Sequence, residues 1–134
     1  MIENGRYHFT EDCDRVAELL RRVGDKWSVL IVVLLEFGPR RFNDLKRSIP
    51  GISQRMLTLT LRGLERDGLV KRTVTPTIPP HVSYELTALG RSLSVPVKAL
   101  CQWAEENITA IDVARTRFET GDAAQHPRQI LVAK

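Results

Sequence analysis

The sequence predicts a mainly α-helical domain that carries one small β-hairpin, an α+β fold. Apolar residues recur at spacings of three and four in five segments, which is typical of amphipathic helices. Period-two alternation is confined to two short runs on either side of a Pro-rich stretch. The chain has 134 residues, of which 43% are hydrophobic, so we expect one domain with its own core.

The first two helices are predicted to follow a polar N-terminal arm, residues 1–12. Gly24 ends the first helix, which is apolar on one face at Val16, Leu19, Leu20 and Val23. Asp25 can cap a second helix from Lys26 to about Phe37. The residues assigned to its core face are Trp27, Leu30, Ile31, Leu34 and Leu35. Because this helix is apolar nearly all round, we expect it to be central and buried.

A short third helix and a fourth helix are predicted next, separated by a tight turn. The third carries Phe42, Leu45 and Ile49 on one face, and Pro50-Gly51 breaks it. Ser53 can cap the fourth helix, which runs to about Asp67 before Gly68 ends it.

The remaining elements are a hairpin and a long helix. The runs Leu69–Val74 and Val82–Leu86 alternate in character, and the prolines between them exclude a helix. Thr87 can cap the long helix, in which we expect a kink at Pro96 and leave open a break near Asn107. Residues 120–134 have no periodicity and are interpreted as a flexible tail.

This order of elements is typical of a winged helix-turn-helix, in which the hairpin is the wing. The charge has a matching distribution: the segment 40–72 has nine basic and three acidic residues, a net charge of +6 in a chain whose total is +4. A positive charge concentrated in this way indicates a nucleic-acid partner, here double-stranded DNA.

The fourth helix carries the residue types that recognise bases. Leu57, Leu61 and Leu64 share the face assigned to the core. Gln54, Arg55 and Thr58 are the predicted base contacts, because a recognition helix usually reads bases near its N-terminus. Leu59 projects roughly opposite the core, and it either contacts a thymine methyl group or is simply exposed.

The other predicted DNA-binding residues are expected to position the protein mainly through phosphates. Those at or near the third helix are Arg40, Arg41, Asn43 and Lys46. Those on the fourth helix are Ser53 and Arg62. Those around the wing, which could meet either the backbone or a minor groove, are Lys71, Arg72 and His81, although His81 could equally be a plain surface histidine.

Other classes of protein find little support in the sequence. The chain has no Gly-rich phosphate loop, and its three histidines are scattered, so we expect no enzyme, no metal site and no cofactor. Its two cysteines, Cys13 and Cys101, are too few for a disulfide scaffold. We see no signal peptide, and the run Val29–Leu35 is too short to span a bilayer, so we expect a cytoplasmic protein.

Several short motifs occur in a fixed order along the chain. They are Val23-Gly-Asp-Lys-Trp27, Gly38-Pro-Arg-Arg-Phe42, Ile49-Pro-Gly-Ile-Ser53, Met56-Leu57, Leu61-Arg-Gly-Leu-Glu65, Asp67-Gly-Leu-Val70, Pro79-Pro80, Tyr84-Glu-Leu-Thr87 and Leu89-Gly90. Together they resemble the motifs of the HxlR-type winged helix-turn-helix transcriptional regulators. The resemblance covers Cys13 to Ala104. It implies a homodimer on a near-palindromic operator, and we expect repression.

The resemblance also implies that different segments of the chain bind DNA and form the dimer. Residues 13–107 would form the winged domain and residues 108–119 a C-terminal dimerisation helix. The predicted dimer contacts are Val16, Leu19, Leu93, Val97, Leu100, Trp103, Ile108 and Ile111. Cys13 matches the cysteine of thiol-sensing members, which react with oxidants or electrophiles, although here Asp14 replaces the usual proline. Cys13 could instead be retained for packing, and Cys101 is expected in the core.

Two alternatives remain open. One is a winged-helix module that binds proteins and has lost DNA binding, which the basic segment disfavours. The other is a regulator that responds to a small molecule bound without a covalent bond.

Overall fold

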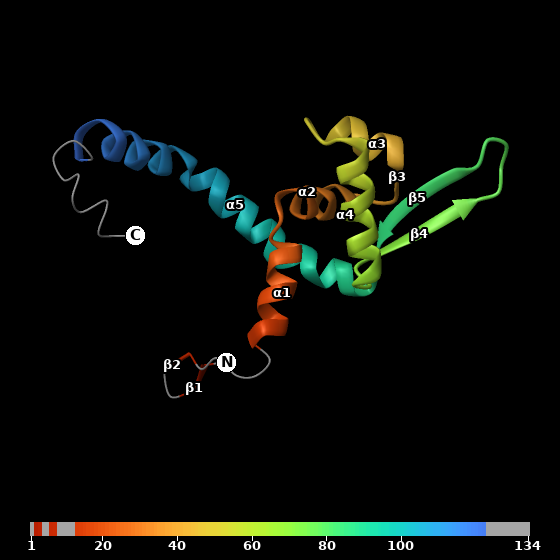
Figure 1. The fold of residues 1–134 in the computed structure, drawn as a ribbon, viewed down its shortest axis with the longest axis horizontal. Helices are drawn as coiled ribbons and strands as arrows, with labels where there is room; N and C mark the ends of the chain where they lie inside the picture. Colours follow the sequence, from red (N-terminus) through yellow and green to blue (C-terminus); the bar gives the residue numbers. More distant parts are fainter. Residues whose placement is uncertain (1, 4–5, 8–12, 123–134) are drawn as a thin grey trace. The chain divides into compact units, whose positions relative to one another are not determined.

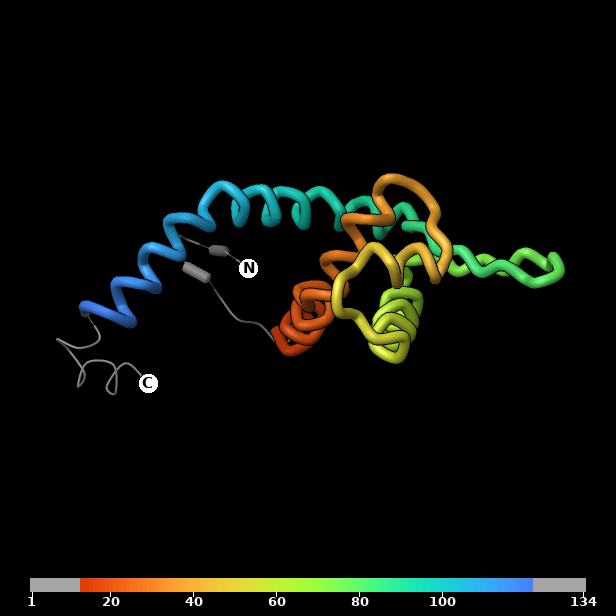
Figure 2. The backbone as a smooth tube through the Cα atoms, turned by 90° about the horizontal axis from the view of Figure 1, so that it is seen from above, coloured from red at the N-terminus to blue at the C-terminus, as the bar shows by residue number. Residues whose placement is uncertain are grey.

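The computed structural model describes residues 2–3, 6–7 and 13–122, and side chains from 13 to 121. The chain forms two compact units, residues 1–97 and 98–134, which are treated separately. The first unit contains four helices: α1 (Cys13–Val23), α2 (Lys26–Leu35), α3 (Phe42–Ser48) and α4 (Gln54–Arg66). It also contains the start of the long helix α5 (Ala88–Arg117). Figure 1 shows α2, α3 and α4 side by side, and Figure 2 shows the hairpin projecting from them.

The core is built around α2 and α4. Asp25 caps α2 as predicted, because its carboxylate accepts from the amides of Trp27 and Ser28. The predicted core face of α2 is only partly correct, since Leu30 is 36% exposed. The buried face consists of Ser28, Ile31, Val32 and Leu35. Where apolar residues surround a helix, their spacing does not determine which side faces inward.

The end of α4 is closed by a glycine turn that the sequence predicted. Gly68 has φ +76°, a conformation that favours glycine. Its amide donates to Glu65 O at 3.0 Å, and the Leu69 amide donates to Leu64 O at 2.9 Å. These two bonds satisfy carbonyls of the last helical turn and direct the chain into the wing.

The wing is part of a three-stranded antiparallel sheet with the order β3-β5-β4. Strands β4 (Val70–Thr75) and β5 (His81–Leu86) form the predicted hairpin. The third strand, β3 (Arg40–Arg41), was not predicted; the sequence placed both arginines at or near the start of the third helix. A two-residue strand has no readable alternation, and it forms here because Arg40 and Arg41 pair with Tyr84 and Ser83.

Helix α1 is joined to α4 by an ion pair rather than by a buried face. None of the residues of α1 is buried, and Val16, Leu19 and Leu20 are 50%, 50% and 61% exposed. The Nε atom of Arg22 lies 3.1 Å from the Oδ2 atom of Asp67, which follows α4.

The start of α5 is held tightly against the end of α4. Thr87 caps α5, as predicted, by accepting from the amide of Gly90 at 3.1 Å. The same hydroxyl donates to Gly68 O, and the Thr87 amide donates to Leu69 O at 3.1 Å. Gly90 is buried and touches the backbone of Leu69.

The later part of α5 answers the question of a break that the sequence left open. The helix contains Pro96 and continues without a break past Asn107, whose side-chain amide donates to Trp103 O. A π-helical turn, Phe118–Asp122, follows. Residues 120–122 of the predicted tail are therefore helical, and residues 123–134 lie outside the described part of the chain.

The predicted N-terminal arm contains two short strands, β1 (Ile2–Glu3) and β2 (Arg6–Tyr7), which pair antiparallel. Among the described residues, no helix is long and apolar enough to cross a membrane. The same residues contain no group of three or more His, Cys, Asp or Glu side chains arranged to hold a metal ion.

Candidate nucleic-acid interface

Helix α4, which the sequence predicts to read bases, is oriented by its cap and its leucine face. Ser53, predicted both as cap and as DNA contact, accepts from the Met56 amide at 3.0 Å through its hydroxyl. Leu57, Leu61 and Leu64 are at most 1% exposed, which confirms the predicted core face. Because these leucines fix which side of α4 faces the core, the 100° rotation between successive residues determines the direction of every other side chain on the helix.

The predicted base contacts all lie on the exposed side of α4. Gln54, Arg55, Thr58 and Arg62 are exposed. Among residues 13–121, no ion pair engages Arg55 or Arg62, so both guanidinium groups are available to an anionic partner. The Thr58 hydroxyl donates to Gln54 O at 2.9 Å, so it can offer a partner an acceptor oxygen and a methyl group.

A second basic surface lies between α3 and the wing. A groove of about 720 Å³ lies there, and its lining includes three arginines and a histidine. The lining residues are Arg41, Phe42, Asn43, Asp44, Arg47, Arg72, Pro79, Pro80, His81, Val82 and Tyr84. It brings together Arg41 and Asn43 with Arg72 and His81, which the sequence had assigned to separate segments. We refer to it as the α3–wing groove.

Two of the predicted phosphate contacts lie elsewhere. The Nε atom of Arg40 donates to Leu34 O at 3.4 Å, so this half-buried side chain is directed to the end of α2. The reason is the unexpected strand β3, in which successive side chains point to opposite faces and only Arg41 reaches the groove. Lys71 is likewise separated from Arg72 and stands across from Glu85. Lys46 is exposed on α3.

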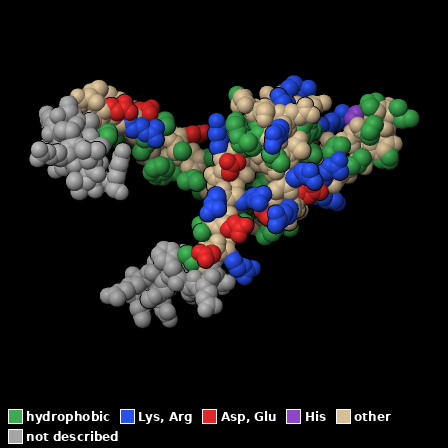
Figure 3. Space-filling view, viewed as in Figure 1, with side chains coloured by type: hydrophobic (Ala, Val, Ile, Leu, Met, Phe, Trp, Pro, Cys, Tyr) green, Lys and Arg blue, Asp and Glu red, His purple; other side chains and the backbone are tan. Residues whose placement is uncertain are grey.

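The structure adds residues that the sequence analysis did not select. Arg47 lines the α3–wing groove and pairs with Asp44 on the same helix. Arg66 is exposed on α4. A helical projection of α3 could have suggested Arg47, but its position opposite the wing depends on tertiary structure. Figure 3 shows Lys and Arg side chains spread over α1, α3, α4 and the base of the wing, with apolar side chains at the wing tip.

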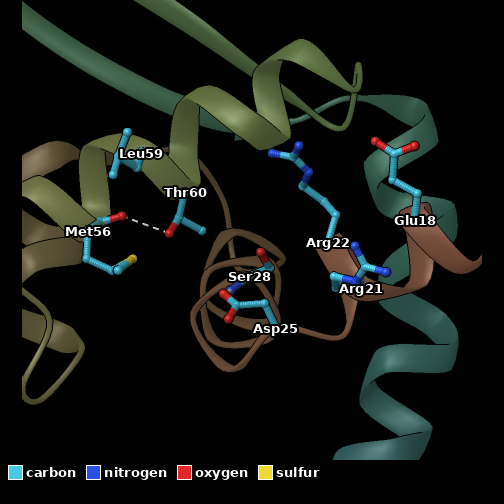
Figure 4. A pocket seen from close by; sticks show the side chains of 8 residues that line it. All are labelled: Glu18, Arg21, Arg22, Asp25, Ser28, Met56, Leu59 and Thr60. Carbon is cyan, nitrogen blue, oxygen red and sulfur yellow. Dashed lines mark hydrogen bonds between the residues drawn. The ribbon is translucent and has the colours of Figure 1, made fainter.

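A separate cavity of about 420 Å³ lies between α1, α2 and α4 (Figure 4). Its lining is mixed in charge: Glu18, Arg21, Arg22, Asp25, Ser28, Met56, Leu59 and Thr60. The Thr60 hydroxyl donates to Met56 O at 2.7 Å. The close-up shows Thr60 directed toward Ser28, whereas Leu59 points away from both Ser28 and Asp25.

Most of the predicted dimer contacts leave apolar surface uncovered in the single chain. Leu100, Trp103 and Ile108 are 61%, 56% and 50% exposed, while Leu93 and Ile111 are half-buried. Val97 is the exception: only 7% of it is exposed, so it belongs to the core of its own chain. A buried side chain has little surface left for a partner.

The burial of one of the two cysteines, Cys101, differs from the prediction. Cys13 is the first residue of α1, with Asp14 in the same turn, and its thiol is free and half-buried. Cys101 is also free and half-buried, although it was expected in the core.

The fold places the chain in the winged helix-turn-helix class of transcriptional regulators. Residues 22–112 match the HxlR-like helix-turn-helix family model. The protein belongs to the HxlR-like family, as its motifs predicted.

Individual proteins agree with this assignment. The HTH-type transcriptional regulator YtfH of Escherichia coli K12 is 44% identical over 107 residues, which are 80% of this chain and 84% of that protein. The structure of the transcriptional regulator ytfH from Salmonella typhimurium has a TM-score of 0.76 at 42% identity, covering 83% of this chain and 98% of that one. The reduced form of the redox regulator HypR has a TM-score of 0.69 at 40% identity, covering 74% and 98%.

Proposed function

We propose that this regulator binds double-stranded DNA as a homodimer, inserts the N-terminal part of α4 into the major groove, and represses transcription. The main support for this proposal is that α4 is anchored in the core by one face and exposes polar and basic side chains elsewhere. The exposed side chains are Gln54, Arg55, Thr58 and Arg62. A major groove about 12 Å wide admits one α-helix, and these side-chain types can pair with base edges.

The α3–wing groove supports a second contact with the same DNA. Arg41, Arg72 and His81 line it together, and Arg41 and Arg72 can donate to phosphate oxygens. A phosphate backbone held there would position α4 without reading sequence. Affinity would then be divided between the groove and the base contacts of α4.

The exposed apolar residues of α1 and of α5 support a homodimer. Val16 and Leu19 on α1, and Leu100, Trp103 and Ile108 on α5, have half or more of their surface exposed. Symmetric dimers bind half-sites separated by about one turn of DNA, or about 10 base pairs, so a near-palindromic operator follows.

The proposal is tested by measuring DNA affinity across a salt series. The wild-type protein is titrated into labelled fragments of its own upstream region, and its mass in solution is measured by light scattering. We expect a dimer whose log affinity falls linearly with log salt, with a slope of about −0.9 for each phosphate contacted. Absence of binding to any fragment at low salt would contradict DNA binding and favour a protein-interaction module.

We further propose that oxidation of Cys13 lowers the affinity for DNA. Its position at the start of α1 and the similarity to HypR, which is a redox regulator, support this proposal. Diamide takes up two hydrogens as two thiols form a disulfide. We expect it to weaken DNA binding of the wild type about 5- to 150-fold, the usual range of coupling between sites.

The test compares three proteins before and after diamide. Cys13→Ser is expected to keep its affinity under oxidation. Cys101→Ser, which also loses one thiol, separates a disulfide that uses Cys101 from one between two Cys13 thiols. An equal response of the wild type and Cys13→Ser would contradict the proposal.

A further inference from the structure

We infer that Leu59 recognises thymine by contacting its C5-methyl group, so that apolar contact contributes to sequence reading by α4. This inference rests on the proposed DNA binding and concerns the same helix. It assigns a role to a residue that neither the predicted base contacts nor the α3–wing groove includes.

The orientation of α4 places Leu59 on the face farthest from the core. The buried leucines at positions 57, 61 and 64 define the inward direction. With 100° between successive residues, the opposite side is occupied by Arg55, Leu59, Arg62 and Arg66. Leu59 is 52% exposed in the middle of this otherwise basic stripe.

About half of this side chain stays exposed in the described part of the chain, although it also lines a shallow pocket beside Arg22 of α1. Leu59 borders the cavity between α1, α2 and α4, but in Figure 4 it points away from Ser28 and Asp25. A lone exposed leucine requires no explanation by itself, but this one lies between arginines on the proposed reading face.

The spacing along α4 matches the structure of a major groove. Arg55 precedes Leu59 by four residues and Arg62 follows it by three, so the two arginines are about 10 Å apart along the helix axis. The groove is about 12 Å wide, with phosphates along both edges and base edges on its floor. If Arg55 and Arg62 reach toward bases or phosphates on the two sides of the groove, Leu59 lies between them above the base edges. The methyl group of thymine is the apolar group that these base edges present in the major groove.

The neighbouring threonine is less suited to this central position. The Thr58 hydroxyl hydrogen is already donated to Gln54 O at 2.9 Å. Thr58 also lies closer to the edge of the exposed face, beside Gln54. The apolar surface at the centre of the stripe therefore comes from Leu59.

The test uses deoxyuridine, which pairs like thymidine and lacks only the methyl group. An operator is first selected with the wild-type protein from random duplex DNA, and each thymine of a half-site is then replaced in turn. We expect at least one position per half-site where the replacement weakens wild-type binding about fourfold, equivalent to burying one methyl-sized group. Leu59→Ala should bind the thymine and uracil duplexes equally.

Leu89→Ala is the matched control, because Leu89 is 57% exposed at the start of α5 and outside the proposed interface. This variant should keep the wild-type preference for thymine. The inference is overturned if no position depends on the methyl group, if Leu59→Ala retains the dependence, or if Leu59→Ala dissociates the dimer. Salt-sensitive binding without methyl dependence would overturn this inference alone, whereas absence of binding would overturn the proposed function as well.

Discussion

Replacement of Gly90 by alanine is expected to destabilise the protein by about 2–3 kcal/mol, the upper part of the usual cost of overpacking. Alanine ordinarily favours a helix over glycine by about 1 kcal/mol, so the expected sign is reversed here. A Cβ atom at this position would lie 2.0 Å from the carbonyl oxygen of Leu69 and 3.1 Å from the Cδ2 atom of Leu86.

The Leu69 backbone cannot easily move away from such an atom. Its carbonyl oxygen accepts from the Thr87 amide at 3.1 Å, and its own amide donates to Leu64 O at 2.9 Å. The neighbouring Gly68 carbonyl accepts from the Thr87 hydroxyl at 2.6 Å. Displacing Leu69 would therefore disturb the end of α4 and the start of α5 together.

Urea unfolding followed by circular dichroism measures this effect, with Gly63→Ala as the matched control. A Cβ at Gly63 would lie 1.9 Å from the Nη1 atom of Arg22, but that atom is the end of a flexible side chain that can move. We expect a change of less than about 1 kcal/mol for Gly63→Ala, because improved helix propensity offsets the displacement. A Gly90→Ala protein as stable as the wild type would contradict the close approach.

Replacement of Arg55 by alanine is expected to weaken binding to a selected operator about 10- to 100-fold. Arg55 is exposed in the first turn of α4, and a bidentate pairing of arginine with guanine contributes about 1–3 kcal/mol of discrimination. The loss should be smaller on unrelated DNA, because a base contact supports the specific complex only. Fluorescence anisotropy with both kinds of duplex measures the difference.

Two other arginine variants serve as controls that distinguish a base contact by Arg55 from a phosphate contact or a general effect of charge. Arg62→Ala should weaken binding to both kinds of DNA and reduce the salt slope by about 0.9, as expected for loss of one phosphate contact. Arg91→Ala removes the same charge from an exposed position on α5 and should leave affinity nearly unchanged. If Arg55→Ala and Arg91→Ala bind alike, Arg55 is not a base contact.

The elements that the sequence predicted well are those governed by neighbours along the chain. Asp25, Ser53 and Thr87 cap helices because a short polar side chain reaches an amide two or three residues away. The face of α4 was also predictable, since three leucines at helical spacing leave one inward direction. The same argument failed for α2, whose apolar residues surround the helix.

The features that required the tertiary structure depend on residues far apart in the sequence. Strand β3 exists because β5, more than 40 residues later, supplies its hydrogen-bond partners, and this pairing separates Arg40 from Arg41. Likewise, the α3–wing groove brings Arg41 and Arg72 together only when the hairpin folds back beside α3. The sequence by itself determined the helices, their caps and the residues that α4 exposes, because these follow from contacts within a few residues. The folded chain alone decided which basic side chains share a surface, because that depends on the pairing and packing of distant segments.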